Sequence, residues 1–91
     1  MRKRATVFYS GRVQGVGFRY TVREIACGYE LTGYVRNVHD GRVELVAEGT
    51  EEEIAAFLGA VRASQLGSHI RNENMNWQEA AGEFRGFDIR Y

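Results

Sequence analysis

The 91-residue chain contains no proline, only one cysteine and only one lysine. A lone cysteine, Cys27, cannot form a disulfide within the chain, which favours a reducing compartment. Cysteine and histidine form no cluster with metal-ligand spacing, so we expect no metal site. No apolar run approaches the roughly 18 residues that a membrane span needs, and no signal-peptide pattern follows the basic start. We therefore expect a cytoplasmic protein without membrane contacts.

An excess of either charge is also absent, because 12 Lys and Arg balance 12 Asp and Glu. Nucleic-acid-binding domains usually carry a basic excess, so the balance argues against a nucleic-acid partner. Every basic residue except Lys3 is an arginine. The planar guanidinium suits two-point contacts with carboxylate or phosphate, although a biased genome composition explains the same excess.

The apolar pattern divides the chain into short strands and two helices. We expect a strand over 5–13, a helix whose apolar stripe runs from Phe18 to Tyr29, and strands over 31–38 and 42–48. Asp40-Gly41 between the last two strands is a strong hairpin signal. Thr50 and Glu53 form the pattern of a capping box at the start of a second helix.

The remaining third of the chain gives weaker signals. We expect a loop over 65–69, a strand over 70–80 despite its asparagines, and a final strand over 86–91 with Phe87, Ile89 and Tyr91 inward. The length fits one domain, residues 1–91. The order predicts an α+β, ferredoxin-like β-α-β-β-α-β sandwich with an antiparallel sheet, two helices on one face and a short C-terminal strand. This fold hosts many functions and decides none.

The stretch SGRVQGVGFRY, residues 10–20, joins the first strand to the first helix. Gly15 and Gly17 can adopt positive φ, so that successive N–H groups converge at a helix N-terminus, where an anion is favoured. Arg19 would add a charged, two-point donor. A tight turn with a solvated arginine fits the same spacing. The spacing matches neither the mononucleotide loop nor the dinucleotide fingerprint.

Two blocks of the sequence resemble the signatures of the acylphosphatase family. They are GRVQGVGFR, residues 11–19, and GYVRNVHDGRVELVAEG, residues 33–49, in the same order and at the same spacing. The resemblance implies the fold above and hydrolysis of the carboxyl-phosphate bond of a small-molecule acyl phosphate, without metal or cofactor. It also implies that inorganic phosphate or another anion can occupy the loop. Nothing in the sequence requires more than a monomer.

The resemblance assigns roles to individual residues. Arg19 would bind the phosphoryl group and Asn37 would orient the attacking water. The phosphate oxygens would be held by the backbone N–H groups of residues 14–19, namely Gln14, Gly15, Val16, Gly17, Phe18 and Arg19. Without the resemblance, an asparagine before a turn often binds only local backbone. The chain departs from the family pattern at Tyr9, where we expect an effect on packing, and over 67–82.

Other reactive residues have simpler interpretations. We expect His39 to be a solvated turn residue in place of a base, and Cys27 to be a buried small residue in place of a nucleophile. Arg12 and Arg36 would attract an anionic substrate or lie at solvated strand ends.

Two rival functions remain open. A nucleic-acid module would use Phe8, Tyr34 and Trp77 on an open sheet face to stack bases. The second rival is a non-catalytic or accessory domain, because a similar domain occurs at the start of larger hydrogenase-maturation carbamoyltransferases. A chain of one domain favours the stand-alone enzyme.

Overall fold

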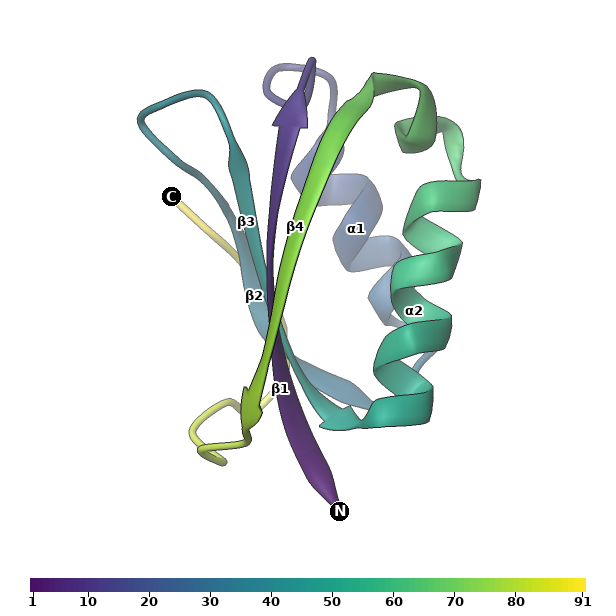
Figure 1. The fold of residues 1–91 in the computed structure, drawn as a ribbon, viewed down its shortest axis with the longest axis vertical. Coiled ribbons are helices and arrows are strands. Elements are labelled where there is room, and N and C mark those ends of the chain that lie inside the picture. Colours follow the sequence, from purple (N-terminus) through teal and green to yellow (C-terminus); the bar gives the residue numbers. More distant parts are fainter.

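A five-stranded sheet with two helices on one face organises the computed structural model, which describes residues 1–91 (Figure 1). Its elements are β1 (Arg2–Gly11), α1 (Phe18–Ala26), β2 (Leu31–Asn37), β3 (Val43–Thr50), α2 (Glu51–Ala63), the 3₁₀ helix η1 (Gln65–His69), β4 (Ile70–Glu79) and β5 (Phe87–Arg90). The predicted ferredoxin-like sandwich and the order of its helices and strands are confirmed, with shifts of one to three residues at several strand ends.

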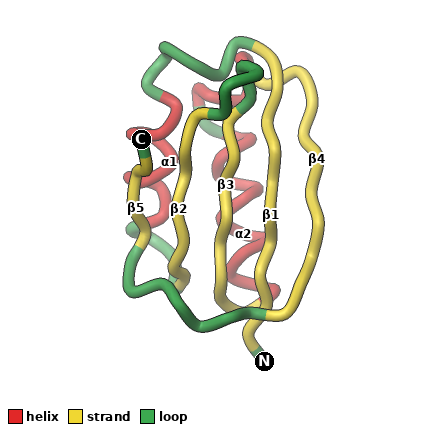
Figure 2. The backbone as a smooth tube through the Cα atoms, turned by 90° about the vertical axis from the view of Figure 1, so that its left-hand side faces the viewer, coloured by secondary structure: helices red, strands yellow, loops and turns green.

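The strands lie in the order β4-β1-β3-β2-β5. β1 pairs antiparallel with β3 and β4, and β2 pairs antiparallel with β3, whereas β5 runs parallel to β2. The parallel direction follows from the 80–86 connection, which crosses the ends of the central strands before β5 begins (Figure 2). The sheet is therefore mixed, and β5 forms the edge opposite β4.

The core lies between the sheet and the helices. Residues at alternate positions of β1, including Ala5, Val7 and Tyr9, are fully buried, as the period-2 pattern predicts. The Tyr9 ring packs against Phe18, with centroids 5.2 Å apart, which confirms that Tyr9 faces the core. Its hydroxyl has no hydrogen-bond partner, and burial raises the pKa of Tyr9.

The start of α2 confirms half of the predicted capping box. The Glu53 N–H donates to Thr50 Oγ1 at 3.2 Å, so Thr50 is the N-cap. The carboxylate of Glu53 does not return to Thr50, because it accepts instead from the N–H of Glu30 at 2.8 Å. Glu53 therefore ties α2 to the segment that leads into β2.

Four local predictions are wrong. Residues 65–69 form a 3₁₀ helix, not a loop, because Leu66 is buried and the Ser64 side chain accepts from its N–H at 3.1 Å. Cys27 is exposed, since α1 ends at Ala26. Tyr91 lies beyond the end of β5 and is fully exposed.

The fourth wrong prediction concerns Trp77, which does not join Phe8 and Tyr34 on the open face. It pairs with Ala5, whose side chain faces the helices, and cross-strand partners share a face. The rings of Phe8 and Tyr34 each carry a guanidinium, with Arg42 at 4.4 Å and Arg90 at 4.0 Å from the centroids.

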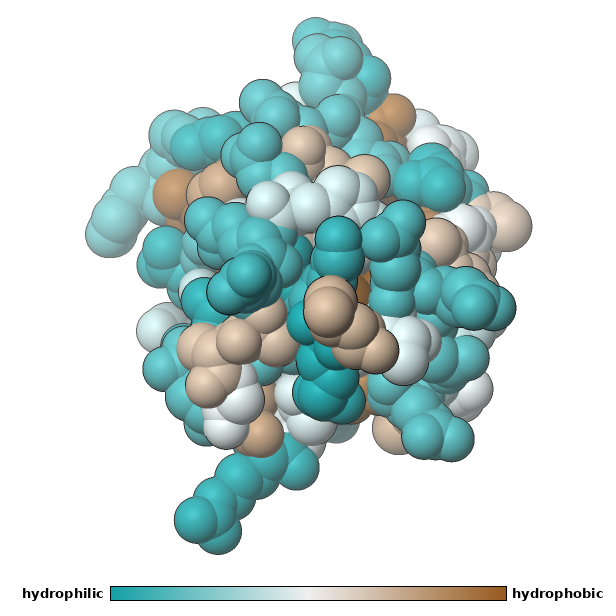
Figure 3. All heavy atoms as spheres, turned by 60° about the horizontal axis from the view of Figure 1, so that its bottom comes forward, coloured by the Kyte–Doolittle hydropathy of each residue, from teal (hydrophilic) through white to brown (hydrophobic).

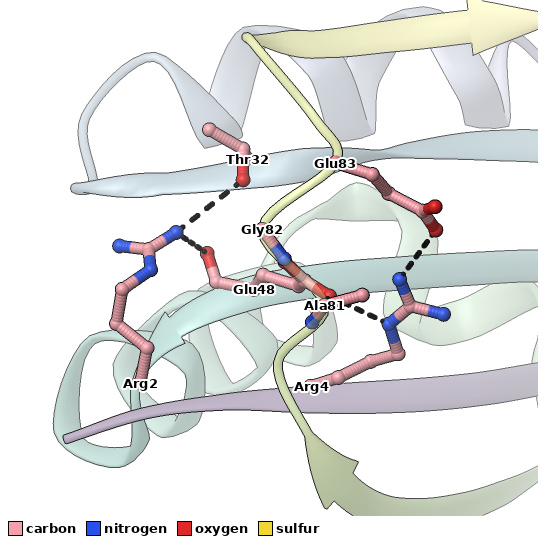
Figure 4. A network of polar contacts seen from close by, with 7 residues as sticks. All are labelled: Arg2, Arg4, Thr32, Glu48, Ala81, Gly82 and Glu83. Atoms are coloured by element: carbon pink, nitrogen blue, oxygen red, sulfur yellow. Dashed lines mark hydrogen bonds and ion pairs between the residues drawn. The ribbon is translucent and has the colours of Figure 1, made fainter.

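A buried carboxylate on the open face holds the 80–86 connection (Figure 4). Glu48 accepts hydrogen bonds from the N–H groups of Ala81 at 2.8 Å and Gly82 at 3.0 Å, and from Arg4 Nε at 2.7 Å. Arg4 also pairs with Glu83 at 2.8 Å. We call Glu48, Arg4, Ala81 and Gly82 the Glu48 clamp.

The surface at the N-terminal end of the molecule is mainly hydrophilic, with small, scattered apolar areas (Figure 3). No helix is both long enough and apolar enough to cross a membrane.

Candidate active site

Two glycines shape the loop between β1 and α1. Gly15 and Gly17 have positive φ angles of 78° and 74°. Residues with a side chain rarely adopt this backbone conformation. A Cβ at either position would meet nothing within 4 Å, so the glycines are required by backbone conformation and not by crowding. Gly17 is the N-cap of α1 and no side chain caps this helix. The N-terminus of α1 therefore lacks the partner that Thr50 provides for α2.

The N–H groups of this turn have no acceptor within the protein. The first hydrogen bond of α1 runs from Thr21 N–H to the carbonyl of Gly17 at 3.0 Å, and the N–H groups of residues 15–20 form none. Such donors at a helix N-terminus carry the positive end of the helix dipole. The loop can therefore receive an anion.

Gln14 fixes the start of the loop to the β2–β3 hairpin. Its side-chain amide donates to the carbonyls of Val38 at 2.8 Å and Arg42 at 2.9 Å. These bonds join the first signature block to the second. The Gln14 side chain thus supports the loop from outside the hollow described next.

Arg19 and Asn37 line one hollow of about 120 Å³. Arg19 lies on the first turn of α1, and Asn37 is the last residue of β2, 18 positions later in the sequence. The fold brings them together because α1 begins and β2 ends at the same end of the sheet. The hollow is lined by Val13, Gly15, Gly17, Phe18, Arg19, Tyr20, Asn37, Ile89 and Tyr91. No acidic side chain is among them.

Arg19 is held by the last residue of β5, Arg90, and by the residue after it, Tyr91. Its Nη1 donates to the carbonyl of Arg90 at 3.3 Å, and its guanidinium lies 4.8 Å from the centroid of the Tyr91 ring. Both contacts leave other guanidinium N–H groups for a ligand, because arginine has five donors. The C-terminal strand thus positions the arginine of the first block.

The structure brings together most of the predicted site residues. Gly15, Gly17, Phe18, Arg19 and Asn37 line the hollow, whereas Val16 packs against the core and Gln14 anchors the loop. The binding of phosphate by the N–H groups of residues 14–19 stays a prediction.

Ile89 and Tyr91 were not predicted as site residues. Their place depends on the parallel pairing of β5 with β2, for which the sequence contains no signal. His39 is exposed in the hairpin and lies outside the hollow, as does Cys27.

A larger hollow of about 530 Å³ lies beside Met1 and Trp77. None of its lining residues belongs to either signature block, and the chemistry of loop, arginine and asparagine is absent from it.

Comparison with known proteins shows the family of the chain. The acylphosphatase family model matches residues 5–89. The chain belongs to the acylphosphatase family. An acylphosphatase of Caldanaerobacter subterraneus subsp. tengcongensis is 37% identical over 89 residues, covering 98% of this chain and 99% of that one. Acylphosphatases are hydrolases, and the chain is an enzyme of this class.

Solved structures of the acylphosphatase fold superpose over nearly the whole chain. The crystal structure of the Bacillus subtilis acylphosphatase matches with a TM-score of 0.89 and 36% identity, covering 98% of this chain and 99% of that one. A full-length HypF structure matches with a TM-score of 0.86 and 28% identity, but only 12% of that chain is covered. The fold therefore also occurs as a small part of a much longer protein.

Proposed function

We propose that the chain hydrolyses acyl phosphates to a carboxylate and inorganic phosphate without a metal ion. In this reaction the N–H groups of the 14–19 loop and the Arg19 guanidinium bind the phosphoryl group, and the Asn37 amide orients the attacking water. The observation that supports the proposal most is the hollow shared by Arg19 and Asn37, beside N–H groups that have no acceptor in the protein.

The leaving group explains why so few residues suffice. An acyl phosphate releases a carboxylate, whose acid has a pKa of about 4, so its departure needs no general acid. The hollow has no acidic side chain, and this reaction does not require one. The remaining requirements of phosphoryl transfer are positioning and charge neutralisation, which Arg19 and the loop can supply.

Asn37 suits the role of orienting water because its amide both donates and accepts hydrogen bonds. The water would attack phosphorus in line with the bond to the carboxylate, and its proton would pass to a phosphate oxygen. A pH profile of kcat/KM tests this last step, because an essential titrating side chain near neutral pH would contradict it.

The deciding experiment follows phosphate release from a synthetic aromatic acyl phosphate in the presence of EDTA. We expect turnover by the wild type, weaker binding and lower activity in Arg19→Gln, and near-zero turnover with retained phosphate binding in Asn37→Ala. Arg85→Gln and Asn76→Ala are matched controls, because both residues are exposed and lie outside the hollow.

Two results would contradict the proposal. One is a wild-type protein that releases no phosphate from any acyl phosphate tested, which would favour an accessory role. The other is unchanged turnover in Asn37→Ala. Acetyl phosphate, carbamoyl phosphate and 1,3-bisphosphoglycerate present the same reacting group, so the choice of physiological substrate needs a separate comparison of kcat/KM values. We expect the catalytic unit to be one chain in the cytoplasm.

A further inference from the structure

A second basic hollow lies where β1 ends and β4 begins. These strand ends lie at the same end of the sheet as the β1–α1 loop (Figure 1). The hollow has a volume of about 310 Å³. It is lined by Gly11, Arg12, Ser68, His69, Ile70 and Arg71, and none of these residues lines the hollow of Arg19 and Asn37. No acidic side chain lines it.

An irregularity in the sheet brings the two arginines of this hollow together. Ser10 pairs with Asn72 and Gly11 pairs with Ile70, so Arg71 is an extra residue without a partner on β1. Such a bulge redirects the side chain of the extra residue. Arg12 directly follows Gly11, and its N–H donates to the carbonyl of His69 at 2.9 Å.

Gly11 is required for this close approach. Its φ is 124°, and a Cβ there would lie 2.5 Å from the His69 carbonyl oxygen and 2.7 Å from the Arg71 nitrogen. Any other residue would push the start of β4 away from β1. The close backbone contact between Gly11 and the start of β4 therefore fixes where the backbones of Arg12 and Arg71 lie relative to each other.

Within the chain, these arginines differ from most others. Every arginine except Arg12, Arg71 and Arg85 has a side-chain hydrogen bond, an ion pair or an aromatic ring as partner. Two of the three exceptions line the same hollow. Like charges on one hollow repel each other, and a bound anion between them would relieve that repulsion.

We propose that this hollow, defined by Arg12, His69 and Arg71, is a second anion-binding site that takes a phosphate or carboxylate group. Arginine forks bind such groups with charge-assisted hydrogen bonds. The His69 ring adds a further donor. The Ser68 hydroxyl is already used, because it donates to the Gln65 carbonyl at 3.1 Å. The anion is either free inorganic phosphate or a second anionic group on the acyl phosphate, and the second source rests on the function proposed above.

The binding test titrates inorganic phosphate into ¹⁵N-labelled protein at constant ionic strength. We use Arg19→Gln beside the wild type, so that binding at the first hollow is weakened. We expect the amide signals of Gly11, Arg12 and His69 to shift saturably in both proteins. Arg12→Gln and Arg71→Gln should each weaken this binding roughly ten-fold, since charged hydrogen bonds contribute that much.

Arg85→Gln is the matched control, because Arg85 is exposed and has no side-chain partner but lies on the 80–86 connection. It should leave the phosphate affinity unchanged. Thermal unfolding of each variant checks that the fold is intact. The proposal is overturned if the signals of Gly11 and His69 do not saturate, or if they shift equally in the Arg12→Gln/Arg71→Gln double variant.

Kinetics then identify the source of the anion. The double variant is compared with the wild type on an acyl phosphate whose acyl group carries a second phosphate and on one whose acyl group is neutral. A KM that rises several-fold only for the first substrate assigns the hollow to the substrate's second group. If the double variant has the same KM as the wild type for both substrates while its phosphate binding is weaker, the hollow binds free phosphate. If neither substrate is turned over, the proposed function fails, while the titration still decides the anion site.

Discussion

The β1–α1 loop and the 80–86 connection, which the Glu48 clamp holds, lie at opposite ends of the sheet (Figure 1). Both have backbone N–H groups near an arginine, which is Arg19 at the loop and Arg4 in the clamp (Figure 4). Glycines with nearly the same φ shape them, 74° at Gly17 in the loop and 74° at Gly82 in the clamp. In the clamp, the N–H groups of Ala81 and Gly82 donate to the Glu48 carboxylate.

The two places differ in where the anion comes from. The clamp contains its own carboxylate, fully buried and bound by Arg4, so it fixes the 80–86 connection. The loop has the donors and Arg19 but no acidic side chain in its hollow. The same arrangement of donors is structural when the chain supplies the anion, and it can bind a ligand when the chain supplies none.

The largest expected effect is a loss of activity when Arg19, and not Arg4, is replaced. Arg19→Gln should lower kcat/KM for an acyl phosphate by roughly a hundred-fold or more, because it removes a charged donor to the transferring group. Its free energy of unfolding should stay close to that of the wild type, since the polar partners of Arg19 are only the Arg90 carbonyl and the Tyr91 ring at the C-terminal end of the chain. Initial rates and urea unfolding measure both quantities. A loss of stability as large as the loss of activity would contradict the comparison.

Arg4 is expected to show the opposite behaviour. Arg4→Met leaves the buried Glu48 carboxylate without its guanidinium and should lower the free energy of unfolding by about 3 kcal/mol. The folded fraction should keep its kcat, because Arg4 lies outside the hollow of Arg19 and Asn37. Urea unfolding gives the first quantity and initial rates at low temperature give the second. An unchanged free energy of unfolding would show that the Arg4–Glu48 contact does not stabilise the fold.

Added phosphate should stabilise the protein against unfolding by binding at the loop, and not through the Glu48 clamp. At ten times its Kd, phosphate should raise the free energy of unfolding by about 1.4 kcal/mol. Arg19→Gln should reduce this gain, and any remainder should disappear when Arg12 and Arg71 are also replaced by glutamine. Thermal unfolding with and without phosphate, at constant ionic strength, measures the difference. Arg4→Met should gain as much as the wild type.

Acid should release the clamp before it affects the loop. Burial alone would raise the pKa of Glu48, but the N–H groups of Ala81 and Gly82 and the Arg4 guanidinium outweigh burial and hold it below its ordinary 4.5. The clamp's stabilisation is therefore present above that value and is lost as the pH falls through the lower pKa of the folded state. Urea unfolding at neutral and acid pH should show that the free energy of unfolding falls in the wild type, by less than the fall caused by Arg4→Met. Glu48→Gln should not show this fall.

Part of this organisation could be predicted from the sequence. The apolar period of the helices, the Asp40-Gly41 hairpin and the Thr50 cap are local patterns, and the structure contains all three. Arg19 and Asn37 were predicted from two separate blocks, and they line one hollow. Cys27 was misjudged because a helix stripe does not show where the helix ends.

The remaining features depend on contacts between distant segments. The second partner of Glu53 is Glu30 N–H, the anchors of Gln14 are carbonyls of the hairpin, and the acceptors for the 80–86 connection lie on Glu48. Of these groups only Glu53 had a predicted local partner, in the capping box with Thr50. Which partner each one takes is decided only when the strands are in register.

By itself, the sequence determined the types of the main helices and strands and the glycine loop. These depend on side-chain period and on glycine at positive φ, which are local properties. The roles of Arg19 and Asn37 were predicted only from the resemblance of two blocks to a family, and they stay a prediction. The tertiary structure decided that β5 runs parallel to β2 and places Tyr91 on Arg19. It also decided that Glu48 fills one set of converging donors and that the other set has no acceptor. Both depend on which distant groups come within hydrogen-bonding distance, and only the packed sheet fixes those distances.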